Sequence, residues 1–204
     1  MKSTALFAIF TTFLLNSCAS FYKTESPQNL SFPSKKELNQ VVFEYKYDYL
    51  SSKYASKQYK KGVKVIALKI TNNTDNDLVF NENLKLTYDN GNFVEVLNIE
   101  QVYSSLKQKS ATYLLYLLLT PLRFETYETN AYGAQETTSS TPIGYVVGPG
   151  VAAGNIIVSS NANQKFKDDL KQNILNGKLI KKGETVYGLI GIKSTNFDNL
   201  TLQF

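Results

Sequence analysis

The side chains that most often carry enzyme chemistry are almost missing from this chain. Its 204 residues include no histidine and a single cysteine, Cys18. Without histidine the chain cannot build a Ser-His-Asp or Cys-His catalytic group, a histidine proton relay or a histidine metal site. A serine activated by a lysine, or carboxylates acting alone, are the remaining ways for it to do chemistry.

One serine and one lysine have a suitable spacing. Ser104 and Lys107 stand three residues apart in a segment expected to be helical, and Ser159-Ser160-Asn161 and Lys181-Lys182-Gly183 follow later. The order of these motifs loosely resembles penicillin-binding proteins and serine β-lactamases, which implies Ser104 as nucleophile and Lys107 as its activator. However, the third motif lacks its hydroxyl residue and the spacings are compressed. Solvated serine and lysine on a helix explain the pattern better, so we expect no catalytic residue.

The acidic residues offer no convincing site either. Asp75, Asp77 and Glu82 are spaced like calcium ligands, but the fifth and sixth positions of the loop hold valine and phenylalanine instead of an oxygen donor and glycine. The pair Asp168-Asp169 has lysines close by in the sequence, which favours an ion-paired surface. We therefore expect no metal and no cofactor, and a hydrolase using carboxylates alone is the least favoured function.

Charge and aromatic content narrow the choice of ligands. Lysine and arginine number 22 and aspartate and glutamate 17, a formal net charge of +5. The basic residues occur as short separate pairs such as Lys60-Lys61, so we expect no nucleic-acid partner. Tryptophan is absent, but fourteen tyrosines leave a glycan or small-ligand binder open as an alternative.

The first residues have the composition of an export signal. Lys2 precedes an apolar run over residues 5–15. This run is too short to cross the roughly 30 Å hydrocarbon layer as a helix, and its length is typical of the apolar part of a signal peptide. We expect residues 1–17 to be a signal peptide that is not part of the mature fold.

The end of this segment, Leu15-Asn16-Ser17-Cys18, resembles the lipobox of bacterial lipoproteins, with leucine three residues before an invariant cysteine and a small residue just before it. The resemblance implies that Cys18 carries a diacylglycerol thioether, so that the lipid bilayer is a partner of the protein. Since Cys18 is the only cysteine, an internal disulfide is impossible. By the same resemblance, Ala19 after the cysteine favours the outer membrane, and the lack of an acidic cluster favours a periplasm-facing protein.

Strand patterns flank the middle of the chain. Residues 18–40, which include two prolines, are expected to be a tether for the lipid. Apolar and polar residues alternate over 43–49 and 84–88, residues 63–71 are almost wholly apolar, and Asp89-Asn90-Gly91-Asn92 predicts a hairpin turn. We expect a mainly β fold, an antiparallel immunoglobulin-like β-sandwich built from residues 41–98 and 178–204, in which early strands pair with late ones. Its architecture loosely resembles immunoglobulin-like domains of bacterial envelope proteins.

Between these blocks, residues 99–177 are expected to form a mostly helical, glycine-rich insertion, α+β overall. Two apolar stretches, 113–119 and 142–158, lie inside it, and the second is interrupted at Gly148-Pro149-Gly150. Glycines four residues apart let helices approach closely. Burial in the core, a protein interface and membrane contact are the three interpretations, in that order. The candidate interface residues are Tyr113, Leu114, Leu117, Gly144, Gly148, Gly150 and Gly154.

Together these patterns predict a membrane-anchored, non-catalytic lipoprotein of the envelope that acts as a binding or assembly module. The main alternative is a subunit of an envelope complex that uses the apolar insertion to contact a protein partner or the membrane. An interface of that kind predicts an apolar patch exposed on the single chain.

Overall fold

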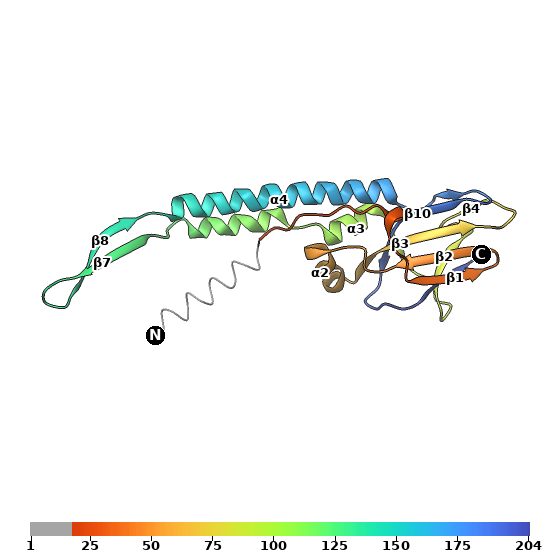
Figure 1. Ribbon diagram of the computed structural model, residues 1–204, viewed down its shortest axis with the longest axis horizontal. Coiled ribbons are helices and arrows are strands. Elements are labelled where there is room, and N and C mark those ends of the chain that lie inside the picture. Colours follow the sequence, from red (N-terminus) through yellow and green to blue (C-terminus); the bar gives the residue numbers. More distant parts are fainter. Residues whose placement is uncertain (1–17) are drawn as a thin grey trace. The chain divides into compact units, whose positions relative to one another are not determined.

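The computed structural model describes residues 18–204, and the expected signal peptide lies outside them (Figure 1). The described chain is a mixed α+β protein made of two compact units. The first unit contains residues 18–21 and Gln108–Asn161, and the second contains Tyr22–Lys107 and Ala162–Phe204.

A five-stranded antiparallel sheet forms the centre of the second unit. The strand order is β1 (Ser34–Leu38), β2 (Val41–Lys46), β3 (Val63–Asn72), β10 (Thr185–Lys193) and β6 (Val96–Leu97). The alternation predicted for β2 is confirmed, because Val41, Phe43 and Tyr45 are buried and their neighbours are half-buried. Pairing of β3 with β10 confirms that early and late strands meet.

Two small sheets accompany the large one. β5 (Lys85–Tyr88) pairs with β11 (Leu200–Gln203), and β4 (Leu78–Val79) pairs with β9 (Leu179–Ile180). Their buried residues share one hydrophobic cluster with β2, β3 and β10. The α+β class is therefore confirmed, but an immunoglobulin-like sandwich is not, because two separate two-stranded sheets stand where a second full sheet was expected.

Helices supply the second hydrophobic cluster of this unit. It contains Tyr54 of α2 (Ser52–Lys61), Val102 and Leu106 of α3 (Ile99–Leu106), and Phe166 and Leu170 of α4 (Gly144–Asn173). The cluster also contains the β3 residues that alternate with those in the first cluster. The start of α3 is fixed by a capping box, in which the side chain of Asn98 accepts from the backbone of Gln101 and the reverse bond is also made. The sequence patterns had not indicated α2.

Two expected boundaries differ from the structure. The predicted tether, residues 18–40, includes a short 3₁₀ turn, η1 (Pro27–Asn29), and the edge strand β1, and Tyr22 is buried. These residues are ordered because β1 completes the edge of the sheet beside β2. The insertion is also smaller than residues 99–177, because α3 and residues 162–177 belong to the second unit.

The first unit is built around a helical hairpin. The 3₁₀ helix η2 (Ser110–Leu119) lies beside the first part of α4, and the strands β7 (Phe124–Thr129) and β8 (Gln135–Thr141) form the β-hairpin that connects them (Figure 1). Contrary to the expected interruption, α4 continues through Pro149. Pro149 lies early in the helix, where its missing N–H removes a single backbone bond.

Candidate functional site

The helical hairpin of the first unit holds most of the residues that the sequence singled out. Its buried cluster is small and consists of Tyr113, Tyr116, Leu119 and Ala152. The rings of Tyr113 and Tyr116 are parallel to within 6° with centres 6.4 Å apart. Burial at every third residue of η2 follows from its three residues per turn, because positions i and i+3 lie one above the other.

Two of the four candidate glycines bring α4 against η2. A Cβ atom on Gly144 would lie 2.3 Å from the carbonyl oxygens of Leu119 and Thr120, and one on Gly148 would lie 3.1 Å from the carbonyl oxygen of Tyr116. A side chain at Gly144 would therefore push the two helices apart. The close approach that these two glycines allow is therefore between two helices of the same chain.

The other two glycines face open space. Apart from the nearby backbone of α4 itself, no atom lies within 4 Å of the position that a Cβ would take at Gly150 or Gly154. Val146 and Ile157 are 77% and 61% exposed and share the same side of α4, because residues 146, 150, 153, 154 and 157 recur at the helical spacing. α4 therefore exposes a smooth apolar stripe on the side that η2 does not cover.

η2 exposes a larger apolar surface, which we call the leucine face. It consists of Leu114, Leu115, Leu117 and Leu118, which are 51%, 67%, 43% and 75% exposed. Since residues three apart are stacked in a 3₁₀ helix, these leucines form two adjacent columns beside the buried tyrosine column. Of the predicted interface residues on η2, Leu114 and Leu117 are on this face and Tyr113 is buried.

The hairpin also carries almost no charge. Residues 110–122 and 137–161 contain no lysine, arginine, aspartate or glutamate. Helices in contact with water normally carry charged residues on their outer side. An uncharged helix pair with contiguous exposed leucines is typical of a surface that contacts something other than water.

The residues that follow Cys18 are attached to this hairpin. The backbone N–H of Ala19 donates to Oδ1 of Asn155 over 2.5 Å. The N–H of Ser20 donates to Oε1 of Gln108 (3.1 Å), whose Nε2 donates back to the carbonyl of Ser20 (2.6 Å). Cys18 itself is exposed. The residue predicted to carry lipid is thus held beside the apolar hairpin by its immediate neighbours.

The chain matches no known protein-family model, no curated protein and no solved structure.

The candidate catalytic residues are engaged in other contacts. The hydroxyl of Ser104 donates to the carbonyl of Gln101 over 3.1 Å, while the ammonium of Lys107 lies 5.4 Å from the centre of the Tyr103 ring. Asp75 forms an ion pair with Lys182. In residues 18–204, no three acidic, histidine or cysteine side chains are grouped closely enough to hold a metal ion, and no helix there is long and apolar enough to cross a membrane.

The expectation of a surface ion pair at Asp169 is wrong. Asp169 is 2% exposed, and its Oδ2 accepts from the hydroxyls of Tyr22 (2.5 Å) and Tyr49 (2.6 Å), while Oδ1 accepts from Nδ2 of Asn173 (2.9 Å). Burial, together with the bond to this carboxylate, raises the pKa of both tyrosines above the ordinary value. The helical spacing of Ala162, Phe166 and Asp169 is the signal that could have revealed this burial.

A second enclosed charge is Lys64. It is 3% exposed, and its ammonium lies 3.0 Å from the centre of the Phe197 ring and 5.5 Å from that of Tyr59. Burial lowers the pKa of this amine. Because aromatic rings surround the amine, it stabilises their packing and is closed to a substrate.

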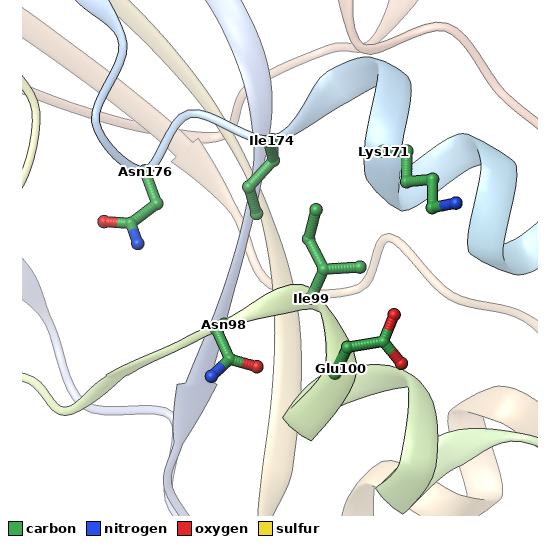
Figure 2. A pocket seen from close by; sticks show the side chains of 6 residues that line it. All are labelled: Asn98, Ile99, Glu100, Lys171, Ile174 and Asn176. Atoms are coloured by element: carbon green, nitrogen blue, oxygen red, sulfur yellow. The ribbon is translucent and has the colours of Figure 1, made fainter.

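An open hollow of about 420 Å³ lies in the second unit (Figure 2). Ile99 and Ile174 lie near one another at its centre, and the polar side chains of Asn98, Asn176 and Lys171 spread around them (Figure 2). Glu100, which also lines it, is paired with Lys167 at 2.8 Å. The polar groups do not converge on one point, so this hollow offers no arrangement for chemistry.

Proposed function

We propose that the protein is a lipid-anchored, non-catalytic lipoprotein of the bacterial outer membrane, facing the periplasm, and that the first unit is its contact module. The observation that carries this proposal is the attachment of Ala19 and Ser20 to an uncharged hairpin with an exposed leucine face. The second unit is the folded body, in which the small sheets would complete an immunoglobulin-like second layer.

Two independent features support the anchor. The sequence Leu15-Asn16-Ser17-Cys18 resembles a lipobox, and the single cysteine is exposed in the structure. An acylated cysteine needs an exposed sulfur, whereas a structural cysteine is usually buried. Two or three acyl chains would hold the chain stably on a membrane, since one chain alone binds only marginally.

Acyl labelling in bacteria tests the proposal. The full chain should incorporate labelled palmitate and fractionate with membranes, and Cys18→Ser should lose both properties completely. A matched control moves the thiol, by combining Cys18→Ser with Ser26→Cys, and Ser26 is exposed. This double variant should stay unlabelled, because acylation depends on the position that follows the lipobox. Labelling of Cys18→Ser would contradict the proposal.

A further inference from the structure

We propose that the leucine face of η2 lies in the interfacial layer of the same bilayer that carries the acyl chains of Cys18. This inference rests on the proposed anchor and names the partner of the contact module, which is a lipid surface. It concerns Leu114, Leu115, Leu117 and Leu118.

The hydrogen bond of Ala19 limits how far Cys18 can lie from the hairpin. Ala19 is bonded to Asn155 in the middle of the hairpin, and Cys18 is one residue away, about 3.8 Å between Cα atoms. While this bond holds, the acylated sulfur stays within roughly 10 Å of α4. The glycerol of the anchor lies at the level of the lipid headgroups, so the hairpin must lie at that level too.

The leucine face has the composition of a surface that lies in the interfacial layer of a bilayer. Interfacial helices bury an apolar face about 5–10 Å into the boundary between headgroups and acyl chains. The leucine face meets this description, and no charged residue within 110–122 would have to leave water with it. η2 is 10 residues long, too short to cross a hydrocarbon layer of roughly 30 Å at about 2 Å per residue, so its leucines are suited to lie along the surface.

Basic residues stand at both ends of the apolar segment. Lys109 precedes η2 and Arg123 follows the apolar run, and both are exposed. Basic side chains that flank an apolar segment can extend their charged ends to phosphate groups while their stems stay with the apolar part. The leucine face is therefore bordered by groups that are complementary to anionic headgroups.

A second copy of the chain fits less well. A stable protein interface buries about 800 Å² on each partner. A 3₁₀ helix of this length is only about 20 Å long, and its outward side alone is narrow for such an interface. A bilayer has no such minimum, since each leucine can insert independently.

The absence of tryptophan from the chain allows a direct test. Leu118→Trp would place a single reporter on the leucine face, Leu115→Trp would give a second one, and Phe93→Trp, at a 62% exposed position of the second unit, is the control. Each full-length variant is purified from the membranes of bacteria grown with labelled palmitate. It is then reconstituted in vesicles of phosphatidylcholine and phosphatidylglycerol, whose acyl chains are either brominated or not. We expect brominated lipid to lower the emission of both leucine-face reporters by about half and to leave the control unchanged.

Other outcomes would overturn the inference. The tryptophan emission could instead shift to shorter wavelength as the protein concentration rises, without being quenched by brominated lipid. This result would mean that the leucine face contacts another protein. Labelled protein with an unshifted, unquenched reporter would refute the membrane contact and leave the proposed anchor standing. Failure of acyl labelling would refute both, and the labelling assay identifies that case separately.

Discussion

At the scale of single residues, the buried carboxylate of Asp169 depends on hydrogen bonds from other side chains of the second unit. It receives three hydrogen bonds, two of them from tyrosine hydroxyls, while almost none of its surface reaches water. A buried charge is tolerated when donors replace its lost hydration. Since Tyr22 is the first residue of this unit, the carboxylate also holds the start of the unit against α4.

Removing this carboxylate should destabilise the second unit strongly. We expect Asp169→Ala to lower the free energy of unfolding by about 3 kcal/mol, because buried hydroxyl and amide donors lose their acceptor. Urea denaturation followed by near-ultraviolet circular dichroism measures this change. The control is Asp168→Ala, whose partly exposed carboxylate accepts from Gln164, and it should change stability by about 0.5 kcal/mol or less. Equal effects of the two substitutions would show that the buried network contributes little.

At the scale of elements, the four glycines of α4 form two pairs, of which one packs against η2 and the other faces open space. Gly144 permits the approach of η2, whereas Gly154 lies in open space. The same substitution should therefore have opposite effects at the two positions, although both glycines are in one helix.

We expect Gly144→Ala to destabilise the hairpin by about 1–3 kcal/mol, because the new methyl group collides with backbone oxygens that cannot rotate away. Gly154→Ala should stabilise α4 by about 1 kcal/mol, the difference in helix propensity. Hydrogen exchange of backbone amides in residues 110–161, measured by mass spectrometry, separates the two effects. Slower exchange in Gly144→Ala than in the parent chain would contradict the packing described for η2.

Strands with a buried face were the elements that the sequence predicted best. β2 alternates because one side of it meets the core, and the Asp89-Asn90-Gly91-Asn92 turn forms with Gly91 at φ 83°. The β7–β8 hairpin was missed because all its strand residues are exposed, so burial imposes no alternation. α2 was missed because its polar sequence has few apolar positions to reveal a helical period.

The candidate site was predictable in part. The apolar content of residues 113–119 marks it as part of the mostly helical insertion expected over residues 99–177, but does not indicate where one helix ends and the next begins. The structure has α3, a break, and then η2, in which the buried residues Tyr113, Tyr116 and Leu119 recur at every third position. Residues three apart lie near one another in both kinds of helix, so a short recurrence at that spacing fits either, and only packing decides between them. The bonds of Ala19 and Ser20 had no sequence signal, because backbone donors are present at nearly every residue.

At the scale of the whole molecule, the two units differ greatly in the size of their cores. The second unit has two large hydrophobic clusters, while the described part of the first unit has a single cluster of four buried residues. Stability within a protein is uneven, and regions with few buried apolar contacts open first. The first unit should therefore be the less stable of the two in water.

Hydrogen exchange of the intact protein in detergent-free and vesicle-bound states measures this difference. In water the amides of η2 should exchange on the order of 100-fold faster than those of β3 and β10. With vesicles the exchange of η2 should slow, because the bilayer supplies the apolar cover that the first unit lacks. Equal protection of both units in water would show that the four-residue cluster is sufficient to stabilise the first unit without a bilayer.

The bonds of Ala19 and Ser20 also impose an order in time. Their partners Asn155 and Gln108 stand 136 and 88 positions later in the chain, so they are synthesised after Cys18. Under the proposed anchor, an enzyme that acylates Cys18 would meet residues 18–20 before the partners of these bonds are in place. Acylation would then come first and closure of the hairpin last, so the protein would finish folding on the membrane that already holds it.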